Sequence, residues 1–596
     1  MFRRQEATIE PDASYPADLK ALGFFVNSLG HIRMIEAPEK QYVFHSTNNE
    51  RHNEVRREAM YTCARQEMEK RLAALSINHI YLPGFTTTKP LSPHVPVLAP
   101  SPEVLKSRKR IIVVVNDAIQ DLGILAYRQL QRELGINGGT AVNFVKEIVK
   151  RSNTGDAAHK YNNIFDDGHG VKDDDDTPTL VVLNTGQLLY SHKYNQAMTL
   201  RSWSAMPRKS IAHDMVRVHQ EENSIPGHRD AKEHIRSVFD SVLYNKDRVS
   251  PEAEIYVIAI EGGTDNLLKI LDEDFDHYGS RITAMALIHS LIDDSQVKNP
   301  TLRAFLHQRA REWRYSDLTN DPDKCTEVPE GYYKEAKGTS AEQFPAPERI
   351  EEHIAWNENV QNPGALSGIV KAMHRLIVSA TPSQKEVPSS ASSDTDTLWS
   401  SGQGAICPTF AGGPESAGEC IFTNSAVQQT VLKFFEEVAQ DPENYRNPNM
   451  STYTEAPLPT PDAPLALDPE NPDIAGFSSL AAEMTPEQME VDEAKEKLQD
   501  MRLALSACPS NVPELASGRA KLVHRIAIQE TKIEKLQKKA LATGGLAAGE
   551  APEQRENWKP QKEGPKVAFA GTMVDSELLK AAGLGDTAEE ELAKLV

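Results

Sequence analysis

The residues with the clearest chemical potential lie directly after an apolar run, at Ala259-Ile260-Glu261-Gly262-Gly263. A short buried strand followed by a tight turn and a helix is the setting in which serine hydrolases hold their nucleophile, within the pattern GxSxG. Here the central residue is Glu261, followed by Gly262 and Gly263. A carboxylate cannot repeat the serine reaction, which needs a hydroxyl deprotonated by a histidine and a hole for the oxyanion. We therefore expect no serine-hydrolase chemistry at this elbow.

Three further side chains are candidates for the same cleft: Asp117, Gln120 and His289. Asp117 and Gln120 follow the apolar run 111–115, where a hydrolase builds part of its oxyanion hole. Capping a helix that starts at about Leu122 is the role that we favour for both, with the cleft as the alternative. His289 follows another apolar run and is either part of the cleft or a partly buried structural histidine.

An enzyme with different chemistry is the alternative interpretation of this cleft. Burial can raise the pKa of a glutamate into a useful range, so Glu261 could act as a general base near Asp117 and His289. The strand end where a late catalytic histidine is expected reads Phe422-Thr423-Asn424 and holds none. The sequence therefore favours a protein that is not an enzyme.

Metal and nucleotide motifs are absent from the sequence. No GxxxxGK[ST], GxGxxG, HExxH or EF-hand spacing occurs, so we predict no cofactor and no metal. An acidic cluster contains His159, Asp166, Asp167, His169 and Asp173–Asp176. We interpret it as a solvated insertion loop, with a metal site as the alternative. The five cysteines include no CxxC pair and are predicted to be reduced intracellular thiols.

The elements that position the elbow alternate between strands and helices. Continuous β-branched runs at 110–116, 180–184 and 254–260 are typical of strands buried on both faces, and 281–288 is similar. Helical patterns separate or follow them, at 122–134, 143–150, 230–244 and 265–271. The pattern predicts an α/β fold with a mostly parallel, α/β-hydrolase-like sheet and helices on both faces.

Changes in composition along the chain predict several separate segments. The α/β domain is expected over residues 1–446, with an insertion at about 316–403 that is disordered near 382–401. Within its final part, 405–410 and 418–422 suggest a strand or loop pair, and 424–438 an amphipathic helix. A Pro-rich linker at 447–484 leads to a helical hairpin or coiled coil at 485–541. A flexible tail with short helices, near 576–582 and 587–595, is expected over 542–596.

Charge limits the classes of partner. The chain has 596 residues and a formal net charge of −21, which repels a bare phosphate backbone and favours a basic protein partner. The basic run 106–110 is either a nuclear localisation signal or the exposed edge of the sheet. No apolar run reaches the length of a signal peptide or a membrane span, so neither secretion nor a membrane is expected.

Several segments in order resemble one protein family. They include Tyr15-Pro16-Ala17-Asp18-Leu19-Lys20, Gln120-Asp121-Leu122-Gly123, Asn184-Thr185-Gly186-Gln187, Ile225-Pro226-Gly227-His228 and the Glu261-Gly262-Gly263 elbow. Over roughly residues 1–448 the chain resembles the Arb-two domain family, named for an Argonaute-binding protein, and its fungal members in particular. The resemblance implies an α/β-hydrolase-like fold but supplies no catalytic residues. Some relatives keep a serine at the elbow, so Glu261 departs from a hydrolytic pattern.

The resemblance also implies a function. It implies a nuclear protein, with the cytoplasm as a second compartment, that belongs to an Argonaute small-RNA chaperone complex acting in siRNA-mediated heterochromatin formation. We predict a non-catalytic scaffold, a pseudo-hydrolase, that binds an Argonaute-type protein and contacts small RNA only through that partner. A hydrolase-like enzyme with a non-serine site around Glu261 is the alternative function. Residues 485–541 offer an apolar seam for self-association.

Overall fold

The computed structural model describes residues 9–132, 134–152, 177–210, 212–330, 332, 404–453, 486–547, 566–569 and 572–575. The acidic cluster at 159–176, most of the predicted insertion and the helices predicted at 576–582 and 587–595 lie outside the described residues. The chain divides into two compact units. One comprises Met1–Met34 and Gln41–Leu458, and the other comprises Ile35–Lys40 and Pro459–Val596.

A nine-stranded sheet forms the centre of the first unit, in the order β12-β13-β11-β10-β9-β5-β6-β4-β3. Its strands are β3 (Asn78–Leu82), β4 (Val95–Ala99), β5 (Arg110–Val115), β6 (Thr179–Val182), β9 (Glu254–Ile260), β10 (Ile282–Ile288), β11 (Ala310–Arg314), β12 (Cys325–Glu327) and β13 (Thr409–Ala411). Every neighbouring pair from β6 to β13 is parallel, whereas β3–β4, β4–β6 and β12–β13 are antiparallel. This confirms the predicted mostly parallel α/β sheet.

The strand order is that of the α/β-hydrolase fold. β5 and β6 exchange places relative to their order in the chain, and β4 is the antiparallel strand next to them. Parallel strands present their carboxyl ends at one edge of the sheet, and ligands of open α/β sheets bind outside that edge. The loops after β5, β9, β10, β11 and β13 therefore meet at the edge where a hydrolase would hold its active site.

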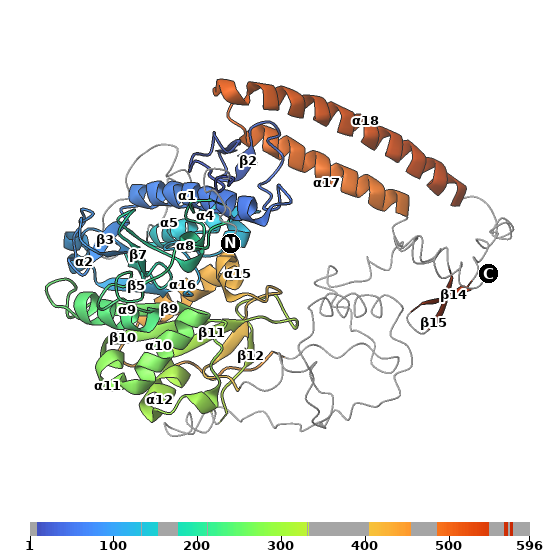
Figure 1. Ribbon diagram of the computed structural model, residues 1–596. Coiled ribbons are helices and arrows are strands. Elements are labelled where there is room, and N and C mark those ends of the chain that lie inside the picture. The colour runs from blue at the N-terminus through green and yellow to red at the C-terminus, as the bar shows by residue number, and fades with distance from the viewer. Residues whose placement is uncertain are drawn as a thin grey trace, which may run out of the picture. The chain divides into compact units, whose positions relative to one another are not determined.

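Helices cover both faces of the sheet. Alternate residues of β9 show this, because Tyr256 and Ile258 belong to one apolar cluster and Val257 and Ala259 to the other. The first cluster includes buried side chains of α1 (Glu50–Ala74), α5 (Ala141–Arg151) and α16 (Ser425–Ala439). The second includes those of α9 (Ala231–Val238), α10 (Gly262–Glu273) and α12 (Pro300–Arg309). Figure 1 shows α10, α11 (Phe275–Tyr278) and α12 on the side of the sheet opposite α1 and α5.

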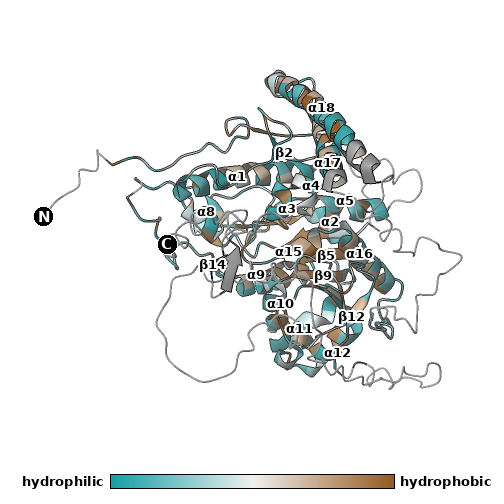
Figure 2. Ribbon diagram, turned by 90° about the vertical axis from the view of Figure 1, so that its right-hand side faces the viewer, coloured by the Kyte–Doolittle hydropathy of each residue, from teal (hydrophilic) through white to brown (hydrophobic). Residues whose placement is uncertain are grey.

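The sheet contains the most apolar strands of the chain. Figure 2 shows hydrophobic residues gathered on β5 and β9, while the outer helices carry many hydrophilic ones. Small hairpins and short helices complete the unit: β1 (Phe24–Val26) with β2 (Ile32–Met34), β7 (Leu189–Ser191) with β8 (Gln196–Met198), α2 (Pro102–Ser107), α8 (Leu200–Ser204) and α11 (Phe275–Tyr278). No described helix is both long enough and apolar enough to cross a bilayer.

Two predicted elements are wrong. The expected helix at 122–134 is replaced by turns, then by α3 (Tyr127–Gln131) and α4 (Gly135–Gly138). Gly123 has a φ angle of +76°, outside the α-helical region, so the helix cannot include it. Arg132, with φ and ψ angles of −102° and −112°, then ends α3 before residue 134. The strand suggested at 418–422 is instead helix α15 (Gly418–Thr423). A short, continuously apolar run does not distinguish a strand from a buried helix.

The second unit confirms the predicted helical hairpin. Helices α17 (Pro486–Ala507) and α18 (Ala516–Ala547) pack through a small cluster that contains Met501, Leu522 and Ile526. The segment 35–40 belongs to this unit and forms ion pairs with α18, at Glu36–Lys521 and Glu39–Arg525. Residues of the predicted flexible tail form a short antiparallel pair, β14 (Lys566–Phe569) and β15 (Thr572–Asp575), which the sequence analysis missed.

Candidate functional site at the strand–helix elbow

Glu261 occupies a sharp turn between β9 and α10. Its φ and ψ angles are 46° and −121°, a conformation that non-glycine residues rarely adopt and that persists only where the surroundings enforce it. The turn also explains why residue 263 is a glycine. A Cβ at Gly263 would lie 2.4 Å from the carbonyl oxygen of Val115, so no larger residue fits against the end of β5. The elbow geometry predicted from the sequence is therefore present, with a glutamate at its centre.

Asp117 binds the backbone amide that follows Glu261. The Gly262 N–H donates to Asp117 Oδ2 at 3.0 Å, and the Ile119 N–H donates to Asp117 Oδ1 at 2.9 Å. In a serine hydrolase, the N–H of the residue after the nucleophile forms part of the oxyanion hole. Here a carboxylate of the same chain takes that position. Asp117 does not cap a helix near Leu122, because the chain forms turns there.

Gln120 also faces the elbow region rather than capping a helix. Its side-chain amide donates to Glu419 Oε2, and Gln120 is buried, with 6% of its surface exposed. The first residue of α3 is preceded by Ala126, whose side chain forms no capping hydrogen bond. The capping role considered for Gln120 is therefore wrong.

Glu419 is the elbow residue that the sequence analysis missed. It lies in α15, just after the loop that follows β13, where a hydrolase fold would place its histidine. The strand predicted at 418–422 places that histidine at Phe422-Thr423-Asn424 instead. A Gly-Gly-Pro sequence at 412–414 marks the real strand end and could have located the loop.

The start of α15 packs directly over the elbow. The Gly418 N–H donates to Glu261 Oε1, and a Cβ at Gly418 would lie 2.6 Å from Glu261 Cγ and 2.8 Å from His289 Cβ. His289 therefore lies beside Glu261. Its backbone N–H donates to the Trp313 carbonyl oxygen at 2.9 Å, and its buried Nδ1 has no hydrogen-bond partner in the described structure.

The structure thus brings all six candidate residues together at one edge of the sheet: Asp117, Gln120, Glu261, Gly262, Gly263 and His289. It adds Gly418 and Glu419 to them. Among the residues that the structure describes, no group of three or more His, Cys, Asp or Glu side chains has the geometry to hold a metal ion. The elbow is consequently a cluster of carboxylates held by backbone and amide hydrogen bonds.

Electrostatics at the elbow raise the pKa of two glutamates, Glu261 and Glu419. Burial, then the nearby carboxylates of Glu261 and Asp117, raise the pKa of Glu419 to about 7. Burial and Asp117 also raise the pKa of Glu261, although the Gly418 N–H opposes the shift. Within the described ranges, no lysine or arginine forms an ion pair with these three carboxylates. Burial, then Arg314, lowers the pKa of His289, so this imidazole is neutral near pH 7.

Comparison with protein families matches residues 15–319 to the Arb2 domain, which is just over half of the chain. The chain belongs to the Arb2 domain family. No curated protein and no solved structure gives a match. The matched part of the Arb2 domain contains Asp117, Glu261 and His289 and ends before Glu419. The family is associated with Argonaute-related complexes and chromatin silencing.

Proposed function

We propose that this Arb2 domain is a non-catalytic scaffold of an Argonaute small-RNA chaperone complex in the nucleus, acting in siRNA-mediated heterochromatin formation. The observation that supports the absence of catalysis best is the Asp117 carboxylate on the Gly262 N–H, at 3.0 Å. A developing oxyanion needs that donor free, and a fixed negative charge beside it repels the anion. Family membership supports the Argonaute partner and the nuclear location.

Two more features of the elbow argue against acyl transfer. Glu261 stands where the nucleophilic serine belongs, and Glu419 lies near the position of the histidine base. Both carboxyl groups are shifted toward the neutral form, which makes them weak nucleophiles. The α/β-hydrolase architecture then serves as a folded frame rather than as an enzyme.

The charge of the chain supports a protein partner. A net charge of −21 steers a basic protein surface toward this one and repels bare RNA. Small RNA is therefore expected to reach the complex through its Argonaute-type partner. Exposed apolar side chains on the helical hairpin, such as Leu503, Val523 and Ile528, are available for self-association through residues 485–541.

Native affinity purification from nuclear extract, with and without ribonuclease, tests the partner. We expect an Argonaute-type protein to co-purify and to survive ribonuclease treatment. Its loss with ribonuclease would show an RNA bridge, and its absence in both cases would refute the proposed partner. The same purification of a chain truncated after Arg446 tests the hairpin. An unchanged oligomeric state and partner set after truncation would refute its role in assembly.

Ester hydrolysis tests the scaffold against the alternative enzyme. We expect the wild-type protein to leave p-nitrophenyl esters intact. Glu261→Ser is also expected to be inactive, because Asp117 still occupies the Gly262 N–H. Wild-type hydrolysis that disappears in a folded Glu261→Ala variant would overturn the proposal and establish a glutamate-based enzyme.

A further inference from the structure

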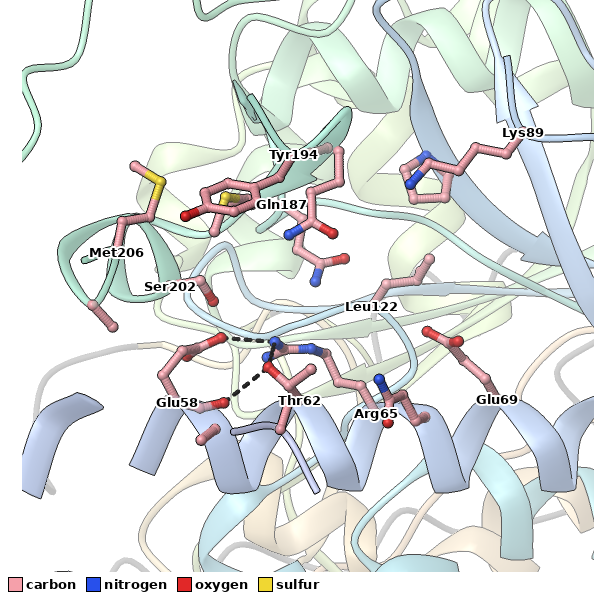
Figure 3. A pocket seen from close by; sticks show the side chains of 18 of the residues that line it. Glu58, Thr62, Arg65, Glu69, Lys89, Leu122, Gln187, Tyr194, Ser202 and Met206 are labelled. Carbon is pink, nitrogen blue, oxygen red and sulfur yellow. Dashed lines mark hydrogen bonds and ion pairs between the residues drawn. The ribbon is translucent and has the colours of Figure 1, made fainter. Parts of the chain in front are cut away.

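A cavity of about 510 Å³ lies in the Arb2 domain, between helix α1 and the β7–β8 hairpin, and none of the elbow residues lines it. Figure 3 shows Glu58, Arg65 and Glu69 projecting from α1 toward this space, with Tyr194 on the opposite side. Cavities of this volume hold small organic ligands. The unused hydrogen-bonding capacity of the lining therefore indicates which kind of ligand fits.

Hydrogen-bond donors on the floor of the cavity are already engaged. Arg65 donates from Nη1 to Asp121 Oδ2 at 3.0 Å and to the Tyr127 hydroxyl at 3.3 Å, and from Nη2 to Glu58 Oε1 at 2.7 Å. Gln187 Nε2 donates to Asp121 Oδ1 at 2.9 Å. These donors offer little to an anionic ligand, which would have to displace an internal partner.

Several hydrogen-bond acceptors that line the cavity, in contrast, are not fully used. Glu58 Oε2 is buried and has no hydrogen-bond partner in the described structure. Glu69 lies three turns further along the same face of α1, 3.8 Å from His79, and burial raises the pKa of its carboxyl. His94 contacts the Ser92 carbonyl oxygen through Nδ1 at 2.8 Å, so Nδ1 carries the proton and Nε2 is an acceptor. The lining thus needs a ligand that supplies donors.

The remaining lining suits an aliphatic cation. Tyr81 and Tyr194 line the cavity with aromatic rings, whose faces attract ammonium groups. Leu122 and Met206 provide apolar surface against which methylene groups pack. Lys89 lies at the same cavity and lowers the pKa of Glu69, so it competes with a ligand for that carboxylate.

We propose that this cavity binds a linear aliphatic polyamine, with one ammonium group at Glu58 Oε2 and another at Glu69. The two residues lie about 16 Å apart along α1, so an amine charged at both ends contacts both carboxylates, whereas a monoamine contacts one. Two guanidinium groups, those of Arg65 and Arg201, balance the carboxylates of Glu58 and Asp121. The inference does not depend on the scaffold function proposed above.

Calorimetric titration of the full chain with spermidine, at about 150 mM salt to screen the acidic surface, tests the proposal. We expect one site per chain and at least tenfold weaker binding of butylamine. Glu58→Gln and Glu69→Gln should each weaken spermidine binding at least tenfold. Glu54→Gln is the matched control, because Glu54 is on the same helix but does not line the cavity. Its affinity should stay within twofold of the wild type.

Two further variants test spermidine binding in the cavity without changing Glu58, in case Glu58→Gln affects folding. Gln196→Trp fills the cavity from an exposed position without changing charge, and should abolish binding. Lys89→Met removes the competing cation and should tighten binding severalfold. An equal loss in Glu54→Gln, many weak sites, or no spermidine binding by the folded wild type would overturn the proposal. Unchanged affinity in both Glu69→Gln and Gln196→Trp would overturn it as well.

Discussion

Asp117 and Asp121 lie four residues apart in the loop after β5, but their carboxylates have opposite electrostatic surroundings. Asp121, whose side chain is fully buried, accepts from Arg65 at 3.0 Å and from Arg201 at 2.5 Å. Burial alone would raise the pKa of Asp121, but these two guanidinium groups outweigh it and lower the pKa. Asp117 instead belongs to the elbow. In the described part of the chain, no lysine or arginine forms an ion pair with the elbow carboxylates of Asp117, Glu261 and Glu419.

The difference separates a structural anchor from a site that responds to its surroundings. Asp121 joins α1, α3 and α8 through a network of charged hydrogen bonds, so its ionisation is fixed near neutral pH. The elbow carboxyl groups lack such compensation, and Glu419 has a pKa of about 7. Burial alone therefore does not show whether a carboxylate is a structural anchor or a group that titrates near neutral pH. The presence or absence of compensating positive charges distinguishes the two.

The largest expected effect comes from breaking the anchor. Asp121→Asn leaves Arg65 and Arg201 buried around a neutral side chain. We expect the free energy of unfolding to fall by about 4 kcal/mol, the usual cost of removing one partner of a buried ion pair. Urea denaturation measures it. The exposed Asp247→Asn is the control and should change the value by less than about 0.5 kcal/mol. Equal effects of the two substitutions would show that Asp121 is not a buried structural anchor.

The next effect tests how tightly the elbow is covered. Gly418→Ala places a Cβ 2.6 Å from Glu261 Cγ, so we expect a loss of about 2–3 kcal/mol of stability from overpacking. Glu261→Ala in the same chain should recover part of that loss, because it removes the clashing side chain. A double-mutant cycle by denaturation measures the coupling. Additive effects would show that α15 does not pack on Glu261.

A smaller effect should depend on pH. The pKa of Glu419 rises from 4.5 to about 7 on folding, so the folded protein binds this proton more tightly than the unfolded chain does. Stability is therefore lost as the pH rises through this range, and the full cost is present above pH 7. Glu419→Gln removes the charge. The rise in pKa corresponds to at most about 3 kcal/mol, and weakening of the Gln120 hydrogen bond to Glu419 Oε2 offsets part of it. We therefore expect the variant to be more stable by about 2 kcal/mol at about pH 8 and little changed below pH 4.5. Thermal unfolding across pH measures this, and a pH-independent difference would contradict it.

The smallest expected effect on stability comes from breaking an exposed ion pair, which serves as a reference for the buried pairs of Asp121. Arg502 and Glu530 form an ion pair at 2.7 Å in the helical hairpin, but 61% and 43% of their side-chain surfaces are exposed. Water already solvates both groups, so Glu530→Gln should cost less than about 0.5 kcal/mol. Denaturation of the full chain, followed by circular dichroism, measures it. A cost as large as that of Asp121→Asn would mean that burial does not set the value of these ion pairs.

Much of the frame could be predicted from the residues alone. The strand 254–260 has its predicted bounds, and Asn424 caps the predicted helix at its N-terminus. Buried parallel strands and capped amphipathic helices carry strong local patterns. The continuous helix predicted at 122–134 does not form, because Gly123 has a positive φ angle and the non-helical backbone of Arg132 ends α3. The predicted domain boundaries stay predictions.

The sequence by itself determined the alternation of strands and helices, the glutamate and glycines of the elbow, and the net charge of −21. Only the tertiary structure decided what those residues do. It placed the Asp117 carboxylate on the Gly262 N–H, brought Glu419 beside Gln120, and set Glu58 against Arg65 above Asp121. Local patterns arise from neighbours in the chain, whereas a pKa, an occupied amide or a cavity depends on groups that lie far apart in sequence and meet only after folding.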